Sequence, residues 1–221
     1  MKWWRIFGIL ALNYHKIEES PTLDSMCVPP ATLEADLRYL KANGFQPITL
    51  SELADYMEGG KSLPARPALI SFDDGYRSHY EIVYPLLRRY GFHANFNVVV
   101  SWVGEEWTMQ WGEIAEMARS GVADIQSHTY DLHRTVADGN GCEGYAVTTR
   151  MRNGADGQFE SDPAYFRRLF DDFCRARRVI EEQLGHVCHF LCYPYHKSNQ
   201  VARRAAWMAG YRGQIWGRGL N

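Results

Sequence analysis

The chain has 221 residues, a mass of 25.4 kDa and a formal net charge of −2 at pH 7. Hydrophobic residues make up 46% and charged residues 23%, which is typical of a globular protein with its own core, so we expect one domain over residues 1–221. Such a weakly acidic chain offers no electrostatic basis for binding nucleic acid or an anionic membrane, and neither is expected among its partners.

The N-terminal apolar run covers residues 6–12 and is interrupted by Gly8. It is far shorter than a membrane span, and no small-residue cleavage site lies before Asn13, so we interpret it as a strand rather than a signal peptide. No export signal or transmembrane segment is therefore predicted, and the compartment and the oligomeric state stay open. Five cysteines without regular spacing predict no disulfide framework.

Hydrophobic patterns predict strands and helices in alternation along the chain. The expected strands cover residues 6–14, 46–49, 68–72, 94–100, 122–126, 187–193 and 211–216. The expected helices are one built on Leu33, Leu37 and Leu40, one at 49–57 that opens with a capping box, one ending at 90 that Pro85 interrupts, and others at 111–120, at 162–184 and ending at 208.

The region between residues 134 and 184 divides into two parts. Its polar, glycine-rich segment 134–160 is expected to be a long loop. The helix that follows is amphipathic, and its expected inward positions are Phe166, Leu169, Phe170, Phe173 and Ile180.

The alternation of strands and helices predicts the fold class. Strands joined by helices form a parallel sheet, and roughly six or seven strands in about 220 residues favour a slightly incomplete barrel. We therefore predict an α/β fold of the distorted (β/α)7-like barrel kind.

Two adjacent carboxylates, Asp73 and Asp74, end the apolar run that starts at Ala68, and Gly75 follows them. A buried strand of an α/β protein delivers side chains in this way to the edge of the sheet where ligands bind. Adjacent residues of a strand point to opposite sides, so one aspartate could hold a metal while the other handles a proton. An ordinary Asp-Gly turn is the alternative.

Two histidines, His128 and His133, follow the strand predicted at 122–126. They would lie about 140° apart around a helix, so they converge only if the chain turns after the strand. Imidazole and carboxylate together suit Zn²⁺ or a similar ion, and three protein ligands leave a position for water. Asp74, His128 and His133 form such a set, although histidines five positions apart are also common without a metal.

At this point the sequence resembles a known family. Ser71-Phe72-Asp73-Asp74-Gly75 is similar to the first motif of the polysaccharide deacetylases, the NodB-type domains of carbohydrate esterase family four. Ser127-His128-Thr129-Tyr130-Asp131-Leu132-His133 resembles their second motif and Tyr193-Pro194-Tyr195 their third. Asn13-Tyr14-His15 and the segment 107–111 resemble the circularly permuted branch that deacetylates poly-N-acetylglucosamine.

The resemblance implies a role for each matching residue. Asp73 would be the general base, and Asp74, His128 and His133 would bind the metal, which is expected to be Zn²⁺, with Co²⁺ or Ni²⁺ as alternatives. The backbone N–H of Tyr195 would bind the oxyanion. His15 would be the general acid, a role that its sequence position alone does not indicate, because a histidine at a strand end is usually structural.

Two positions depart from the family pattern. Cys192 stands where the family usually has an arginine that holds the base, as the permuted branch tolerates. His196 stands where the family usually has glycine, and it would either crowd the site or offer a second acid.

Trp102, Trp107 and Trp111 could stack on sugar rings, with a core role as the alternative. Trp111, Tyr195 and His196 are the expected substrate-binding residues.

Together these features predict a metal-dependent hydrolase that removes N-acetyl groups from an N-acetylhexosamine-containing polysaccharide, its expected partner. Two alternatives remain at this point. One is a metal hydrolase of the same fold that acts on acetyl esters or on a non-sugar amide. The other is a catalytically silent glycan-binding domain.

Overall fold

The computed structural model describes residues 8–19, 26–138, 142–152 and 157–217. Within them the chain forms two compact units, one from Met1–Phe96 with Gly104–Ile125 and the other from Asn97–Val103 with Gln126–Asn221. The single domain over 1–221 stays a prediction. Among the described residues no helix has the length and apolar character needed to cross a membrane.

The first unit is built on parallel strands. β1 (Leu10–Tyr14) and β4 (Gln46–Ile48) both pair in parallel with β5 (Pro67–Asp74), with Tyr14 opposite Phe72 and Ile48 opposite Leu69. Seven of the eight residues of β5 are buried, which is why the strand reads as a nearly continuous apolar run. The polar exceptions lie at its carboxyl end.

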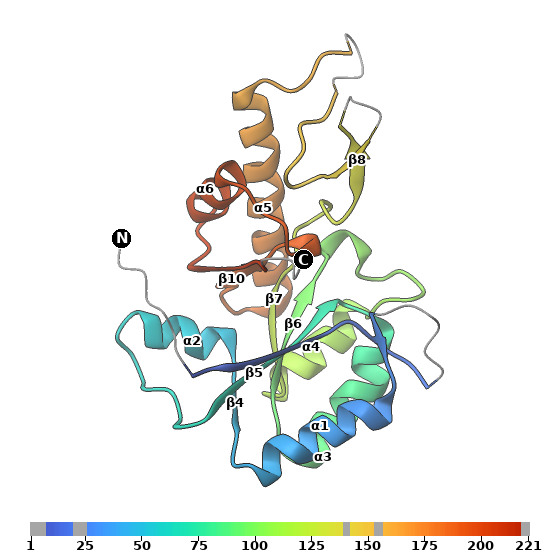
Figure 1. Cartoon of the computed structure of the whole chain (residues 1–221), viewed down its shortest axis with the longest axis vertical. Helices are drawn as coiled ribbons and strands as arrows, with labels where there is room; N and C mark the ends of the chain where they lie inside the picture. Colours follow the sequence, from blue (N-terminus) through green and yellow to red (C-terminus); the bar gives the residue numbers. More distant parts are fainter. Residues whose placement is uncertain (1–7, 20–25, 139–141, 153–156, 218–221) are drawn as a thin grey trace. The chain divides into compact units, whose positions relative to one another are not determined.

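The helices of the first unit follow the predicted patterns. They are α1 (Pro30–Ala42), α2 (Leu50–Met57), α3 (Tyr84–Tyr90) and α4 (Trp111–Arg119). Leu33, Leu37 and Leu40 form the buried face of α1, and the predicted capping box between Thr49 and Glu52 begins α2. α1 and α3 lie side by side (Figure 1), where the Lys41 ammonium donates to the carbonyl of Tyr90.

The helix that was predicted to be interrupted by Pro85 has a different form. A π-helix, η1 (His79–Val83), runs directly into α3, and Pro85 lies in the first turn of α3. The first turn of an α-helix does not need the N–H that proline lacks, so Pro85 is compatible with the start of this helix. The prediction of an interruption was therefore wrong.

Two strands, β6 (Ala94–Val98) and β7 (Ala123–Ser127), run through both units. The hydrogen-bonded order of the main sheet is β1-β5-β6-β7-β10-β11, with β4 also on β5. Buried Asn95 of β6 accepts from the backbone N–H of Leu50 at 2.6 Å and donates to the carbonyl of Ile70 at 2.9 Å. This one amide therefore fixes α2 and β5 to β6.

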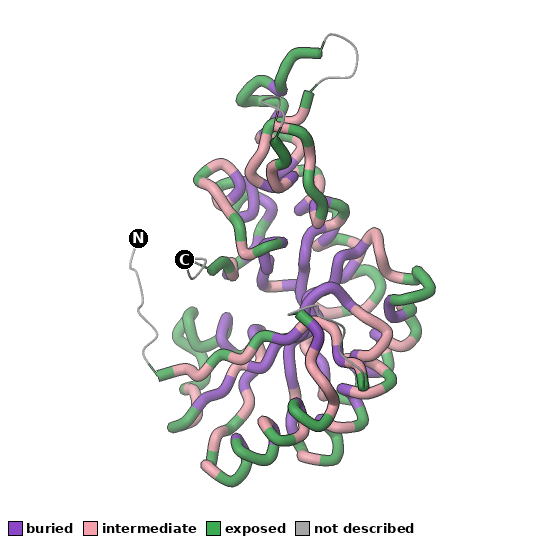
Figure 2. The backbone as a smooth tube through the Cα atoms, turned by 45° about the vertical axis from the view of Figure 1, so that its right-hand side comes forward, coloured by how far each residue is buried: buried purple, intermediate pink, exposed green. Residues whose placement is uncertain are grey.

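The second unit also contains parallel strands. β10 (Phe190–Cys192) pairs in parallel with β7 at Leu191 and Ser127 and with β11 (Gly213–Ile215) along its length. Short 3₁₀ turns, η2 (Val100–Trp102) and η3 (Pro194–His196), follow β6 and β10. α5 (Asp162–Leu184) and α6 (Gln200–Met208) pack on each other (Figure 1). The central strands are buried along most of their length (Figure 2).

The segment 134–160 differs from the predicted loop. It contains an antiparallel hairpin of β8 (Thr135–Ala137) and β9 (Glu143–Tyr145). Arg168 of α5 fixes the following turn, because its guanidinium binds the Glu160 carboxylate at 2.6 Å and donates to the carbonyls of Ala146 and Thr149. Such short strands carry too little periodicity to be predicted from sequence.

A second two-stranded sheet lies near the start of the chain, where β2 (Lys16–Ile17) pairs in parallel with β3 (Cys27–Val28).

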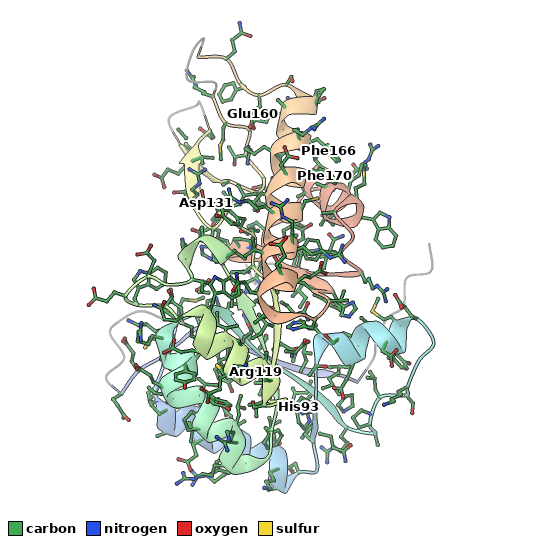
Figure 3. The ribbon with its side chains drawn as sticks, turned by 180° about the vertical axis from the view of Figure 1, so that it is seen from behind. His93, Arg119, Asp131, Glu160, Phe166 and Phe170 are labelled. Atoms are coloured by element: carbon green, nitrogen blue, oxygen red, sulfur yellow. The ribbon has the colours of Figure 1, made fainter. Side chains whose placement is uncertain are left out.

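Two of the inward positions predicted on α5 are wrong. Leu169, Phe173 and Ile180 are buried, but Phe166 and Phe170 are only half-buried. Their rings stack one turn apart on α5 (Figure 3), and the guanidinium of Arg204 on α6 lies 5.9 Å from the Phe166 ring. The buried stripe passes instead through Tyr165 and Ala176.

Candidate active site

The predicted base lies at the carboxyl end of β5 in the first unit. Asp73 and Asp74 are both buried, with exposed fractions of 1% and 5%. The Asn13 amide, at the carboxyl end of β1, donates to the Asp73 carboxylate over 3.0 Å, and Ser71 Oγ donates to the Asn13 carbonyl over 2.8 Å. Because Ser71 fixes which end of the Asn13 amide faces Asp73, the three side chains form an ordered relay.

The backbone changes direction at Asp74. Its φ of 75° lies in the left-handed region, and Gly75 follows with a φ of 80°. A non-glycine residue held in this region costs roughly 1–3 kcal/mol, and such residues cluster at active sites and ligand clamps. The parallel pairing of β1 and β5 brings Asp74 and Asp73 to the same edge of the sheet as His15.

His15 follows β1 and is backed by a second histidine that the sequence did not indicate. The Nε2 atom of His15 lies 3.8 Å from the Asp73 carboxylate, which is too far for a hydrogen bond. The buried Nε2 of His79 lies 2.8 Å from the carbonyl oxygen of His15. Since that carbonyl can only accept, His79 carries its proton on Nε2. Burial lowers the pKa of His79 to about 4 and keeps the ring neutral.

We expect His79 to make the folded chain sensitive to acid. Its pKa is about 4 in the folded chain and 6.5 in the unfolded chain, so the unfolded state takes up the proton first as the pH falls. The free energy of unfolding should therefore decrease by about 3 kcal/mol between pH 6.5 and pH 4 on account of this ring alone. Urea unfolding of the wild type and of His79→Gln, which has no ring to titrate, measures the difference. Parallel stability curves would contradict the prediction.

The second unit carries the predicted histidines. His128 directly follows β7, is 2% exposed, and donates its backbone N–H to the carbonyl of Val98 over 2.9 Å. Its Nδ1 lies 2.8 Å from the carbonyl of Cys192, so Nδ1 carries the proton and Nε2 is the atom left to bind a metal. The His133 ring centroid lies 5.0 Å from that of His128. The chain turn required for the two to converge occurs at Thr129, whose φ is 77°.

The loop that carries His133 is held by the half-buried carboxylate of Asp172 on α5. Asp172 accepts the backbone N–H groups of Tyr130 and Asp131 at 2.9 Å each. Burial raises the pKa of Asp172 to about 6, although both hydrogen bonds oppose the shift. Asp131 lies on the loop beside α5 (Figure 3), and its own carboxylate accepts from Ser101.

The residues of the third motif occupy an unusual turn. Tyr195 and His196 have consecutive φ values of 55° and 54°. This explains why glycine is usual at the second position, since glycine alone takes this conformation without strain. The Tyr195 ring lies between those of His133 and Tyr145, with centroid distances of 4.5 and 4.6 Å.

The predicted tryptophans are not one group within either unit. Trp102 belongs to the second unit, where its ring lies 4.8 Å from that of His133. Trp107 and Trp111 belong to the first unit. Trp107 is 44% exposed and its ring contacts Tyr76, whereas Trp111 is the half-buried first residue of α4.

The structure thus groups His15, Asp73 and Asp74 in the first unit and His128, His133 and Tyr195 in the second. Sequence reasoning missed three supporting residues, Asn13, His79 and Asp172. Each acts through a hydrogen bond to a residue 41 to 64 positions away, so no local pattern indicates it. The only available signal was the position of Asn13 beside the Tyr14-His15 pair at a strand end.

Comparison with known proteins places these residues in a family. Residues 60–214 match the family model described as polysaccharide deacetylase. The poly-beta-1,6-N-acetyl-D-glucosamine N-deacetylase of Escherichia coli K12 is 26% identical over 94% of this chain, which spans 34% of that relative. A putative polysaccharide deacetylase of Bacillus subtilis, YxkH, is 28% identical over 91% of this chain, which spans 61% of it.

Solved structures agree with the sequence relatives. A de-N-acetylase from Aggregatibacter actinomycetemcomitans superposes with a TM-score of 0.86 at 28% identity, covering 93% of this chain and 86% of that chain. IcaB from Ammonifex degensii superposes with a TM-score of 0.76 at 26% identity, covering 92% and 81%. The predicted α/β fold with parallel strands, of the (β/α)7-like kind, is confirmed. The chain belongs to the polysaccharide deacetylase family.

Proposed function

We propose that the chain is a metal-dependent hydrolase that removes N-acetyl groups from an N-acetylhexosamine-containing polysaccharide. The observation that carries the proposal is the base cluster at the carboxyl end of β5, where Asn13 holds Asp73 and the chain turns at Asp74. Membership of the deacetylase family supports it. The relatives named as poly-beta-1,6-N-acetyl-D-glucosamine N-deacetylases suggest the class of glycan, although the chain spans only part of their length.

The donor set fits a divalent metal. Asp74, His128 and His133 each offer one ligand atom, and all three are buried or half-buried. One carboxylate and two imidazoles suit Zn²⁺, Co²⁺ or Ni²⁺. His128 already has its Nδ1–H bound by a carbonyl, as metal-binding histidines usually do. When bound, the ion would polarise the acetyl carbonyl and make water a better nucleophile.

The proton transfers are assigned to residues of the first unit. Asp73 takes a proton from the water whose oxygen forms a bond to the acetyl carbon. As the carbon–nitrogen bond breaks, His15 in its imidazolium form gives a proton to the amine, which is a poor leaving group otherwise. The backbone N–H of Tyr195 would stabilise the oxyanion formed between these steps. Trp111, Tyr195 and His196 are assigned to substrate binding.

Two alternatives predict different results. A deacetylase of O-acetyl esters would release acetate from an acetylated glycan but not from N-acetylglucosamine oligomers. A silent binding domain would retain oligomers without hydrolysing them. The presence of His15, Asp73, Asp74, His128 and His133 together disfavours the silent domain.

Acetate release from β-1,6-linked N-acetylglucosamine oligomers tests the proposal. The protein is stripped of metal and assayed alone and with Zn²⁺, Co²⁺ or Ni²⁺. We expect release only in the presence of a metal. Release of acetate from O-acetylated glycan alone would overturn the assigned substrate, and failure to bind any of the three ions would overturn the assigned chemistry.

A further inference from the structure

Two consecutive residues at the start of the π-helix η1 contact the backbone that carries His15. The Ser78 hydroxyl accepts the backbone N–H of Ile17 at 3.3 Å, and the His79 ring donates to the carbonyl of His15 at 2.8 Å. One donor and one acceptor therefore hold the segment 15–17 from both sides of Lys16. A π-helix is rare and is frequently found at functional sites.

The position of the His79 ring is fixed by the side chains packed around it. It is fully buried, and aromatic rings surround it, with centroids 5.5 Å away at Phe72, 5.7 Å at Phe96 and 5.8 Å at Tyr76. Within the described part of the chain its Nδ1 atom has no hydrogen-bond partner. Burying a polar ring among aromatic side chains is unfavourable, and the hydrogen bond that compensates it among the described residues is made to the strand end that carries His15.

The two ends of the segment 15–17 differ in how far they are buried. Ile17 is completely buried, whereas His15 keeps 15% of its side chain exposed. His15 lies between β1 and β2 and belongs to neither strand. The carbonyl bond from His79 supplies a constraint at the residue itself.

We propose that Ser78 and His79 are positioning residues for His15, holding its backbone so that its imidazole points at the departing amine. The inference rests on the proposed function, in which His15 is the general acid. Neither Ser78 nor His79 touches the substrate in this assignment. Their effect on the reaction passes through the orientation of one ring.

Positioning of the acid matters only when the leaving group needs a proton. In the amide reaction a C–O bond forms from water, the C–N bond breaks, and the nitrogen takes a proton from His15. In 4-nitrophenyl acetate the same attack breaks a C–O bond, and the phenolate leaves with its electron pair and no proton. A misplaced His15 should therefore slow the first reaction and spare the second.

The test compares His79→Phe, which removes the donor, with His79→Gln, whose amide can replace it. For His79→Phe we expect kcat on N-acetylglucosamine oligomers to fall by about 10²-fold, as for a small misplacement of a catalytic group, with KM nearly unchanged. Hydrolysis of 4-nitrophenyl acetate should be retained, and His79→Gln should restore the oligomer rate. Ser78→Ala should lose rate in the same direction, and it provides the answer if His79→Phe does not fold.

Tyr80→Phe is the matched control, because it removes the hydroxyl bond from Tyr80 to Glu116 in the same π-helix without touching residues 15–17. It should leave both rates unchanged. Equal loss on both substrates in His79→Phe, or no rescue by glutamine, would overturn the inference.

A readout without substrate separates this inference from the proposed function. The His15 ring signals in ¹⁵N-histidine-labelled protein, assigned by their loss in His15→Gln, report its orientation directly. We expect them to shift or broaden in His79→Phe and to recover in His79→Gln. Unchanged signals in His79→Phe would overturn the positioning role. If the His15 signals respond to the two His79 variants as expected but the wild type releases no acetate from oligomers, the proposed function is overturned and the positioning role is not.

Discussion

Replacing Asp73 by asparagine should reduce kcat for acetate release by about 10³-fold while leaving metal binding intact, since general base catalysis typically contributes 10² to 10⁴. Asparagine has the same shape but cannot take a proton from water. The neighbouring Asn13 amide, now 3.0 Å from the Asp73 carboxylate, would face another amide, which can still accept through its carbonyl oxygen. The fold and the relay from Ser71 should therefore survive the change.

The measurement is kcat with saturating metal, together with the metal content of the purified variant. Asp124→Asn is the matched control, because Asp124 is a carboxylate of the same unit that binds Ser51 through both oxygens and lies outside the assigned site. It should keep the wild-type rate. If Asp73→Asn kept more than about a tenth of the rate, the base would lie elsewhere.

The elements that the sequence predicted well are those long enough for their hydrophobic pattern to repeat several times. The stripe of Leu33, Leu37 and Leu40 identified α1 and its buried face, and the capping box at Thr49 located the start of α2. The hairpin of β8 and β9 was missed because three-residue strands are too short for a period to show. The amphipathic spacing placed Phe166 and Phe170 in the core, yet both are half-buried, and the Phe166 ring lies 5.9 Å from the Arg204 guanidinium of α6.

The residues of the candidate site also divide into those that the sequence predicts and those that it does not. Residues that carry chemistry lie in contiguous motifs, so Asp73, Asp74, His128 and His133 can be proposed from the sequence alone. Residues that orient them are joined only by the fold. His79, for example, lies four residues beyond Gly75 in the sequence and six beyond Asp73, but its partner is the carbonyl of His15 at the end of another strand. Tertiary hydrogen bonds of this kind produce no repeating pattern in the sequence, so they cannot be predicted from it.

Replacing His128 by alanine should weaken metal binding by more than about 100-fold, because even the partners of metal ligands are worth 10- to 100-fold. His128 Nε2 is the ligand atom assigned here, and the carbonyl of Cys192 holds the ring in place through Nδ1. Titration of metal-free protein with Zn²⁺ or Co²⁺ measures the affinity. Thermal unfolding of the metal-free variant controls for the cavity that removing a buried ring leaves behind.

His93→Ala is the matched control for this change. His93 is a histidine of the first unit, on the loop between α3 and β6 (Figure 3), and its ring lies 3.6 Å from the Glu52 carboxylate. It should bind metal like the wild type. Unaltered affinity in His128→Ala would remove His128 from the donor set. The two large effects are separable, because Asp73→Asn should lose rate with its metal retained, whereas His128→Ala should lose its metal and, as a consequence, its rate.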